Sequence, residues 1–147
     1  MNLTLPLFLA GIFLALGSSL VHGAPKDATV KQQSSYDLMS TENKAMQDDP
    51  TLNPAMFWVG DGEVLWNKPS EQNGKSCASC HGDVRKSMRG VATQFPKMVR
   101  GKLQTLEGQI NQCRESRQHA PKLAYESKDL LALTALIAMQ SKGMPIT

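Results

Sequence analysis

The sequence contains little of what would place it in several large classes of protein. Aromatic residues make up only 5% of its 147 residues, and 16 Lys and Arg against 13 Asp and Glu leave a net charge of +3. The basic residues are spread along the chain, so the composition indicates neither a nucleic-acid-binding protein nor a polybasic membrane-binding protein. Only three cysteines are present. This odd number leaves at least one thiol outside any internal disulfide.

The one long hydrophobic run lies at the N-terminus. Residues 3–20 are almost entirely Leu, Phe, Ala, Ile and small residues, and no charged residue precedes Lys26. Small residues then surround a cleavage position after Gly23, which is the pattern of a secretory signal peptide. The alternative is an uncleaved membrane anchor, because the run approaches the ~20 apolar residues that span a bilayer. We expect residues 1–23 to be a signal peptide and no stable membrane anchor to remain.

The chain after the signal peptide has the length of one ordinary domain. Residues 24–35 have almost no large apolar side chains and are predicted to form a flexible leader. Residues 36–147 are long enough to bury a core without disulfides, so we expect a single domain there.

The first half of this domain contains two predicted helices. Ser40 is placed to cap a short helix that ends at Asp48. Asn53-Pro54 then resembles an N-cap followed by proline at the first helical position of a second helix. Gly60 and Gly62 are poor residues for a helix interior, so we expect another helix to approach closely there.

Two further helices are predicted in the second half. Thr105 is placed to cap one of them, and Ser127 caps a last helix that is predicted to run to Gly143. Three apolar residues share one face of the last helix: Leu130, Leu133 and Ile137. This face is expected to form core, with the terminal helices crossing each other.

The segment Cys77–His81, CASCH, carries two of the three cysteines. A thioredoxin-like dithiol would follow a buried strand, but the preceding KPSEQNG is a polar turn. A structural zinc site would need a fourth ligand from Cys113 or His119, and neither has a second CxxC or HxxxH spacing. In the third interpretation, the two thiols add to the vinyl groups of one haem, and the adjacent histidine becomes the proximal iron ligand.

Only haem attachment needs every residue of this motif, and the dithiol and zinc sites remain the alternatives. We therefore predict one covalent haem c, attached through Cys77 and Cys80, with His81 on the iron. The corresponding fold class is all-α, a cytochrome c-like single haem domain.

The second axial ligand is expected from the segment before the last helix. Cys113 lies there on the apolar side of the predicted helix, and Arg114 and Arg117 would favour its thiolate form. His119 is the rival, near a frayed helix end. Four methionines come third: Met88, Met98, Met139 and Met144. The residues alone favour Cys113 over His119.

Five segments form a pattern more specific than CxxCH: MQDDPTLNPAMFWVGDGEVLW, CASCHG, SMRGVATQFP, INQCRESRQHAP and LAYESKDLLALTALIAMQSKGMPI. Together they resemble the N-terminal half of the SoxA family, the c-type cytochrome subunits of periplasmic sulfur-oxidation systems. The resemblance covers about residues 36–146. It implies a periplasmic location and haem ligation by His81 and a Cys113 thiolate.

The resemblance also implies an activity and partners. SoxA proteins pair with a small cytochrome, SoxX, as an L-cysteine S-thiosulfotransferase that joins thiosulfate oxidatively to a cysteine of the carrier SoxYZ and passes the electrons to haem. Members of the family have a second haem domain, whose haem-ligating cysteine is catalytic. This chain, which ends at Thr147, is expected to be the supporting, non-catalytic half, with no catalytic residue of its own. The alternative is a stand-alone periplasmic single-haem electron carrier.

Overall fold

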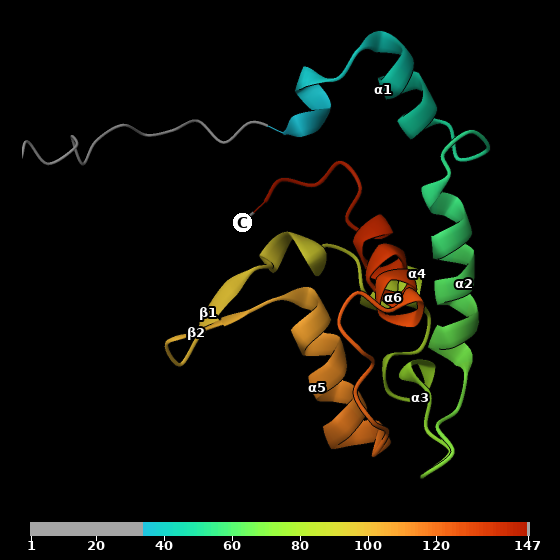
Figure 1. Cartoon of the computed structure of the whole chain (residues 1–147), viewed down its shortest axis with the longest axis vertical. Coiled ribbons are helices and arrows are strands. Elements are labelled where there is room, and N and C mark those ends of the chain that lie inside the picture. The colour runs from blue at the N-terminus through green and yellow to red at the C-terminus, as the bar shows by residue number, and fades with distance from the viewer. Residues whose placement is uncertain (1–33, 147) are drawn as a thin grey trace, which may run out of the picture. The chain divides into compact units, whose positions relative to one another are not determined.

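The computed structural model describes residues 34–146 (Figure 1). The predicted signal peptide, residues 1–23, and nearly all of the predicted leader lie outside the described residues. From Leu38 onward the described residues form one unit, which contains all of their α-helices. Within the described part of the chain, no helix has the length and apolar character needed to cross a membrane.

Helices are the main elements of this unit, so the expected all-α fold is confirmed. Six α-helices follow one another along residues 34–146: α1 Thr41–Asp48, α2 Ala55–Asn67, α3 Cys77–His81, α4 Val84–Ser87, α5 Leu106–Gln118 and α6 Lys128–Met139. Two short 3-10 helices, η1 Ser35–Leu38 and η2 Ala92–Gln94, complete the helical part.

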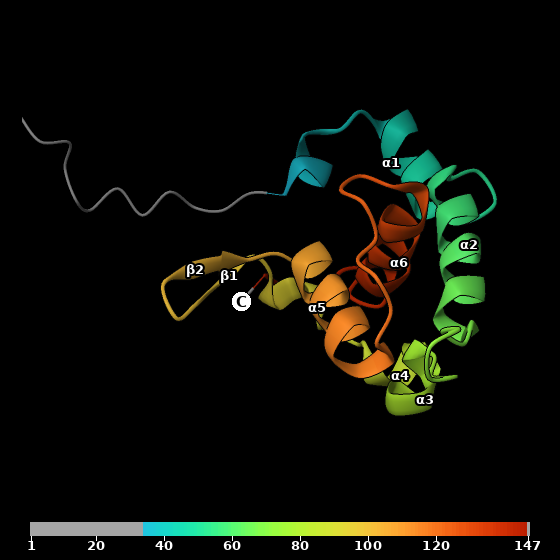
Figure 2. The same cartoon turned by 60° about the horizontal axis from the view of Figure 1, so that its bottom comes forward.

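A small β-hairpin was not expected from the sequence. Strands β1 (Lys97–Val99) and β2 (Lys102–Gln104) pair antiparallel, and Figures 1 and 2 show them extending away from α2 and α6. Arg100 and Gly101 join the strands with φ values of 51° and 76°. Positive φ at both residues suits the twist of a two-residue hairpin. Strands of three residues are too short for their alternation to be recognised in the sequence.

Three helices begin at the capping residues that the sequence predicted. The side-chain oxygens of Ser40, Thr105 and Ser127 each accept a hydrogen bond from the backbone N–H three residues later. Each bond satisfies one of the N–H groups that a helix leaves unpaired at its start. The starts of α1, α5 and α6 are therefore fixed by local chemistry.

The bounds of α2 and α6 differ slightly from the expected ones. α2 begins at Ala55, although Oδ1 of Asn53 accepts a hydrogen bond from the Ala55 N–H at 2.9 Å, as an N-cap does. α6 ends at Met139, and the chain then turns through backbone bonds between residues three apart. Gly143 follows with a φ of 74°, so the predicted glycine stop is present but lies beyond the helix itself.

The core is built where α2 packs against α6 (Figures 1 and 2). A Cβ at Gly62 would overlap the carbonyl of Ala132 and would lie 2.8 Å from the Cβ of Leu136, so glycine is required for this approach. Gly60 faces open space, and the prediction that it also permits close packing is wrong. The predicted α6 face of Leu130, Leu133 and Ile137 is buried, and Leu136 beside it is fully enclosed.

Candidate haem-binding site

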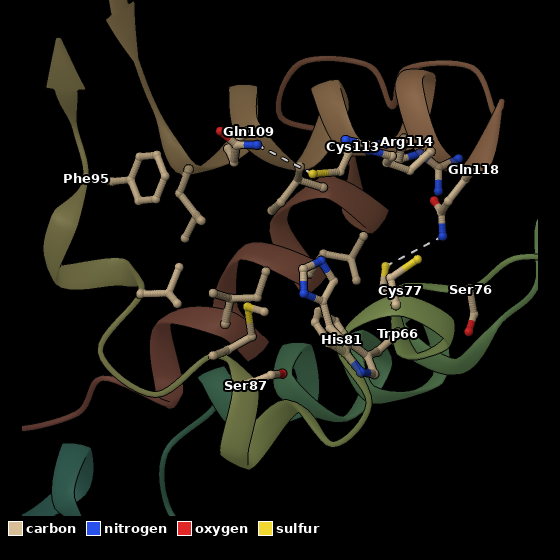
Figure 3. Close-up of a pocket in the computed structure, with 18 of the residues that line it drawn as sticks. Trp66, Ser76, Cys77, His81, Ser87, Phe95, Gln109, Cys113, Arg114 and Gln118 are labelled. Carbon is tan, nitrogen blue, oxygen red and sulfur yellow. Dashed lines mark hydrogen bonds between the residues drawn. The ribbon is translucent and has the colours of Figure 1, made fainter. Parts of the chain in front are cut away.

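The described residues enclose a pocket with a volume of about 420 Å³. This lies within the ~300–1,000 Å³ range of small-molecule sites. Helices α3, α5 and α6 contribute to its walls, and the side chains are shown in Figure 3. Much of the lining is apolar: Trp66, Met88, Leu106, Ile110, Leu133 and Ile137. The pocket therefore suits a large ligand that is mostly apolar.

One wall of the pocket carries the CASCH motif as a single short helix, α3. Ser76 caps it through a reciprocal pair of bonds: its Oγ accepts from the Ser79 N–H at 3.1 Å, and Oγ of Ser79 accepts from the Ser76 N–H at 2.9 Å. Cys77, Cys80 and His81 all line the pocket. The cap therefore fixes the backbone that presents all three predicted haem-attachment residues to one cavity.

Trp66 packs against His81 where both side chains line the pocket. The two rings pack with centroids 5.7 Å apart and an interplanar angle of 40°. The Trp66 Nε1–H donates a 3.0 Å hydrogen bond to the carbonyl of Gly82, the residue after His81. Trp66 is almost fully buried, so this contact is part of the core. The sequence analysis did not single out Trp66, because α2 has no clean apolar stripe.

The facing wall is α5, which carries Cys113. Leu106 and Ile110 are buried on its inner side, and Cys113 lines the pocket beyond them, as the helical spacing predicted. The Nε2–H of Gln109 donates a hydrogen bond to the Cys113 Sγ, with a donor–acceptor distance of 3.4 Å. Figure 3 shows the His81 imidazole pointing from α3 toward this wall. A histidine and a thiol therefore lie on facing walls of one cavity.

The rival ligands have less suitable positions. His119 is exposed at the C-cap of α5, with a left-handed φ of 52°, and does not line the pocket. Met98 is 65% exposed on the hairpin, and neither it nor Met139 or Met144 lines the pocket. Met88, the residue directly after α4, is buried and lines the pocket. Among the described methionines, Met88 is thus the one that competes with Cys113.

Hydrogen bonds hold α5 to the segment that leads into α3. The Ser70 hydroxyl donates to the Gln118 carbonyl at 2.8 Å, and Nδ2 of Asn73 donates to the Arg117 carbonyl at 3.0 Å. Nε2 of Gln118 donates to the Lys75 carbonyl at 3.2 Å. These bonds set the separation of the two walls. Sequence reasoning missed them, because each joins residues more than 40 positions apart.

The lining is positively charged. Four cationic residues line the pocket: Lys75, Lys97, Arg114 and Arg117. Among the described residues, no Asp or Glu lines it. Two other arginines lie outside the lining: Arg85 pairs with Glu63 at 2.6 Å, and Arg89 is exposed. The cavity is therefore suited to a ligand that carries negative charge at its edge.

Burial changes the pKa of one thiol of the motif, that of Cys77. Desolvation raises the pKa of the Cys77 thiol, and the nearby Arg114 guanidinium opposes part of that shift. Gln118 is also buried here, and its Oε1 has no hydrogen-bond partner within residues 34–146. A buried acceptor of this kind is costly unless a bound group or water satisfies it.

These features fit a haem. The apolar lining suits the macrocycle, and the cations suit its propionates. On α3, the half-buried Cys77 and the exposed Cys80 lie beside His81. The unpartnered Gln118 Oε1 also indicates that the pocket holds a group that the protein alone does not supply. Within residues 34–146, no three His, Cys, Asp or Glu side chains gather closely enough to hold a bare metal ion.

The chain resembles known proteins in sequence and in structure. Residues 61–146 match the family model of the SoxA/TsdA cytochrome c domain. The chain is 38% identical over 117 residues to the L-cysteine S-thiosulfotransferase subunit SoxA of Rhodovulum sulfidophilum, which covers 78% of this chain and 41% of that protein. It is 36% identical over 107 residues to the same subunit of Pseudaminobacter salicylatoxidans, covering 71% of this chain and 37% of that protein.

A solved structure has the same fold. The crystal structure of SoxXA from P. pantotrophus matches with a TM-score of 0.70 and 32% identity, over 78% of this chain and 44% of that chain. The chain therefore spans less than half the length of these two SoxA subunits and of the matched chain of the SoxXA structure. The family model covers more than half of this chain and includes both the α3 motif and Cys113. A cytochrome c domain binds haem c covalently through its CxxCH cysteines, and this chain belongs to the SoxA/TsdA cytochrome c domain family.

Proposed function

We propose that this chain is the haem-carrying, electron-transferring domain of a SoxA-type subunit of L-cysteine S-thiosulfotransferase, and that it supports thiosulfate oxidation without performing the sulfur transfer. One observation carries this proposal. Cys77, Cys80 and His81 of α3 and Cys113 of α5 all line the same apolar pocket. Two attachment thiols and two axial donors are what a single low-potential haem c requires.

Each of the four residues has a distinct role in this proposal. Cys77 and Cys80 would hold the haem through thioether bonds, and His81 and the Cys113 thiolate would bind its iron. Trp66 orients His81 by ring packing and by its bond to the Gly82 carbonyl. When bound, the haem supplies a one-electron redox centre.

The rest of the pocket tunes this centre. The apolar side chains of α5 and α6 exclude water, and a drier site strengthens electrostatic effects on the iron. Lys75, Lys97, Arg114 and Arg117 provide positive charge for the propionates. An anionic sulfur donor stabilises ferric iron more than ferrous iron, so the potential lies below that of histidine–methionine cytochromes.

The cysteines also favour a supporting role. The chain has three cysteines, and all of them line the haem pocket. Conjugation of thiosulfate needs an accessible thiol or thiolate as sulfur acceptor. In this proposal two of the thiols are held in thioether bonds and the third is on iron inside the pocket, and the thiol that accepts sulfur is assigned to the second haem domain of SoxA subunits. The same observation supports the alternative of a stand-alone periplasmic single-haem electron carrier, in which sulfur transfer plays no part.

The proposed setting is the periplasm, reached through the predicted signal peptide. The proposed partners are a SoxX-type cytochrome, which forms a heterodimer with the SoxA subunit, and a SoxYZ-type carrier protein that receives thiosulfate. They are supported by the similarity to SoxA subunits and to the SoxXA structure. A binding measurement between the purified domain and a SoxX-type cytochrome separates the two alternatives, because a stand-alone carrier does not need this heterodimer.

Haem attachment is the direct test of the proposal. The protein, produced with a haem c maturation system, should retain one haem after acid-acetone extraction, and intact mass should rise by one haem. Cys77→Ala/Cys80→Ala should lose covalent haem completely. The matched control is Cys113→Ala, which should keep the haem attached with altered axial ligation. Complete extraction of haem from the unmodified protein would overturn the proposal.

A further inference from the structure

Cys113 has a hydrogen-bond donor on its own helix. Gln109 lies one turn earlier on α5, and its Nε2 is 3.4 Å from the Cys113 Sγ. Both side chains line the pocket, and Figure 3 shows the Gln109 amide beside the sulfur on the wall opposite His81. The amide therefore donates to the same atom that the proposed function assigns to the iron.

We propose that Gln109 is a positioning residue that orients the Cys113 thiolate and raises the reduction potential of the haem. This inference rests on the proposed function, in which Cys113 is the second axial ligand. A hydrogen bond draws electron density away from a ligating sulfur, so the thiolate donates less strongly to ferric iron. Ferric iron is then less favoured over ferrous iron than it is with a free thiolate.

The surroundings make this hydrogen bond effective. Gln109 and Cys113 are half-buried beside the buried Leu106 and Ile110, so this apolar wall reduces the water that competes for the sulfur and the amide. Arg114, the next residue on α5, directs its Nε to the Pro121 carbonyl at 3.2 Å. The start of α5 is fixed by the Thr105 cap, which limits movement of the turn that carries Gln109. Gln109 is thus the donor that is placed to act on Cys113.

Gln109→Leu tests the inference, because leucine keeps most of the volume and removes the donor. Two matched controls separate this effect from a general loss of polarity. Gln112→Leu changes an exposed glutamine of the same helix, and Gln94→Leu changes a glutamine that lines the pocket from η2. The measurements on purified holoprotein are a spectroscopic redox titration and the energy of the thiolate-to-iron charge-transfer band.

We expect Gln109→Leu to lower the potential. At an ambient potential where the unmodified haem is half reduced, the ferrous-to-ferric ratio should fall on the order of threefold to tenfold, since one hydrogen bond to a charged acceptor is lost. The charge-transfer band should move to lower energy, because the unbonded thiolate is a stronger donor. Gln112→Leu should match the unmodified protein in both readouts, and Gln94→Leu, which changes the pocket lining away from α5, should leave the charge-transfer band in place. Gln109→Asn keeps an amide but shortens it by one carbon, so it should shift both readouts as Gln109→Leu does.

The Cys113→Met variant separates a failure of the proposed Cys113 ligation from a failure of the inference about Gln109. If its spectrum and potential equal those of the unmodified protein, Cys113 is not a ligand, and both the axial assignment and the role of Gln109 are wrong. If Cys113→Met changes both readouts while Gln109→Leu and Gln109→Asn behave like Gln112→Leu, the inference about Gln109 alone is overturned. A rise in potential in Gln109→Leu would overturn it equally.

Discussion

Trp66 and His81 lie in contact in the wall of the pocket, with their ring centroids 5.7 Å apart. The Trp66 Nε1–H also donates a 3.0 Å hydrogen bond to the Gly82 carbonyl. The indole therefore holds the backbone directly after His81, the proposed haem ligand. Trp66 belongs to α2, which packs on α6. The helix core and the orientation of His81 are therefore coupled through one side chain.

Trp66→Phe should test this coupling. Phenylalanine keeps an aromatic ring but loses the hydrogen-bond donor and leaves a small cavity, so the free energy of unfolding should fall by about 1–3 kcal/mol. Urea denaturation of the holoprotein measures this change. Trp58→Phe, at an exposed position of the same helix, is the matched control and should change stability by less than ~0.5 kcal/mol. Equal losses in the two variants would contradict the coupling.

Two glycines of α2 give a second matched pair. A methyl group at Gly62 would overlap the Ala132 carbonyl of α6, so Gly62→Ala should separate the helices and cost about 1–3 kcal/mol of unfolding free energy. Gly60 faces open space on the same helix. Gly60→Ala should therefore stabilise the protein by roughly 0.5–1 kcal/mol, since alanine is the better helix former. Thermal unfolding of both variants checks the signs, and a stabilising Gly62→Ala would show that the helices do not approach closely.

The sequence predicted those parts of the fold that depend on local chemistry. Ser40, Thr105 and Ser127 cap their helices as expected, because capping involves residues only three positions apart. The apolar face of α6 was also recognisable from its spacing. The two glycines of α2 show the limit of such reasoning, because only Gly62 meets a second helix.

The assembly of the site was not predictable in the same way. α3 is a five-residue helix whose stability comes from the Ser76–Ser79 cap, and short polar helices have no periodicity to recognise. The bonds from Ser70 and Asn73 to the end of α5 join distant parts of the chain. The CxxCH motif and Cys113 were identified as candidates from the sequence, but only the tertiary packing shows that they line one pocket.

The second axial ligand gives a spectroscopic prediction. Cys113→Met should raise the reduction potential by on the order of 0.1–0.3 V, within the ~0.8 V range that axial ligands span, because a neutral thioether favours ferric iron less than a thiolate does. His119→Met is the matched control and should leave the potential unchanged, since His119 is exposed outside the pocket. A methionine-to-iron charge-transfer band in the unmodified protein would instead identify Met88 as the ligand.

The last prediction concerns thiosulfate itself. We expect the purified haem-bound domain not to join thiosulfate to a carrier cysteine, even when a SoxX-type cytochrome and an electron acceptor are supplied. The conjugation forms a sulfur–sulfur bond and releases two electrons, so it requires an accessible sulfur acceptor as well as an oxidant. Arg114 and Arg117 line the pocket and attract a dianion, but attraction without a free thiol gives binding and no turnover.

Intact-mass measurement of the carrier over time tests this expectation directly. The unmodified domain and Cys113→Ala should both leave the carrier mass at the background of a reaction without the domain, because neither offers an acceptor thiol. A carrier adduct that forms at an enzymatic rate with the unmodified domain, and is lost in Cys113→Ala, would make Cys113 the sulfur acceptor and would overturn the supporting role. Retention of that rate in Cys113→Ala would instead indicate Cys77 or Cys80, and would require that one of them is not held in a thioether bond.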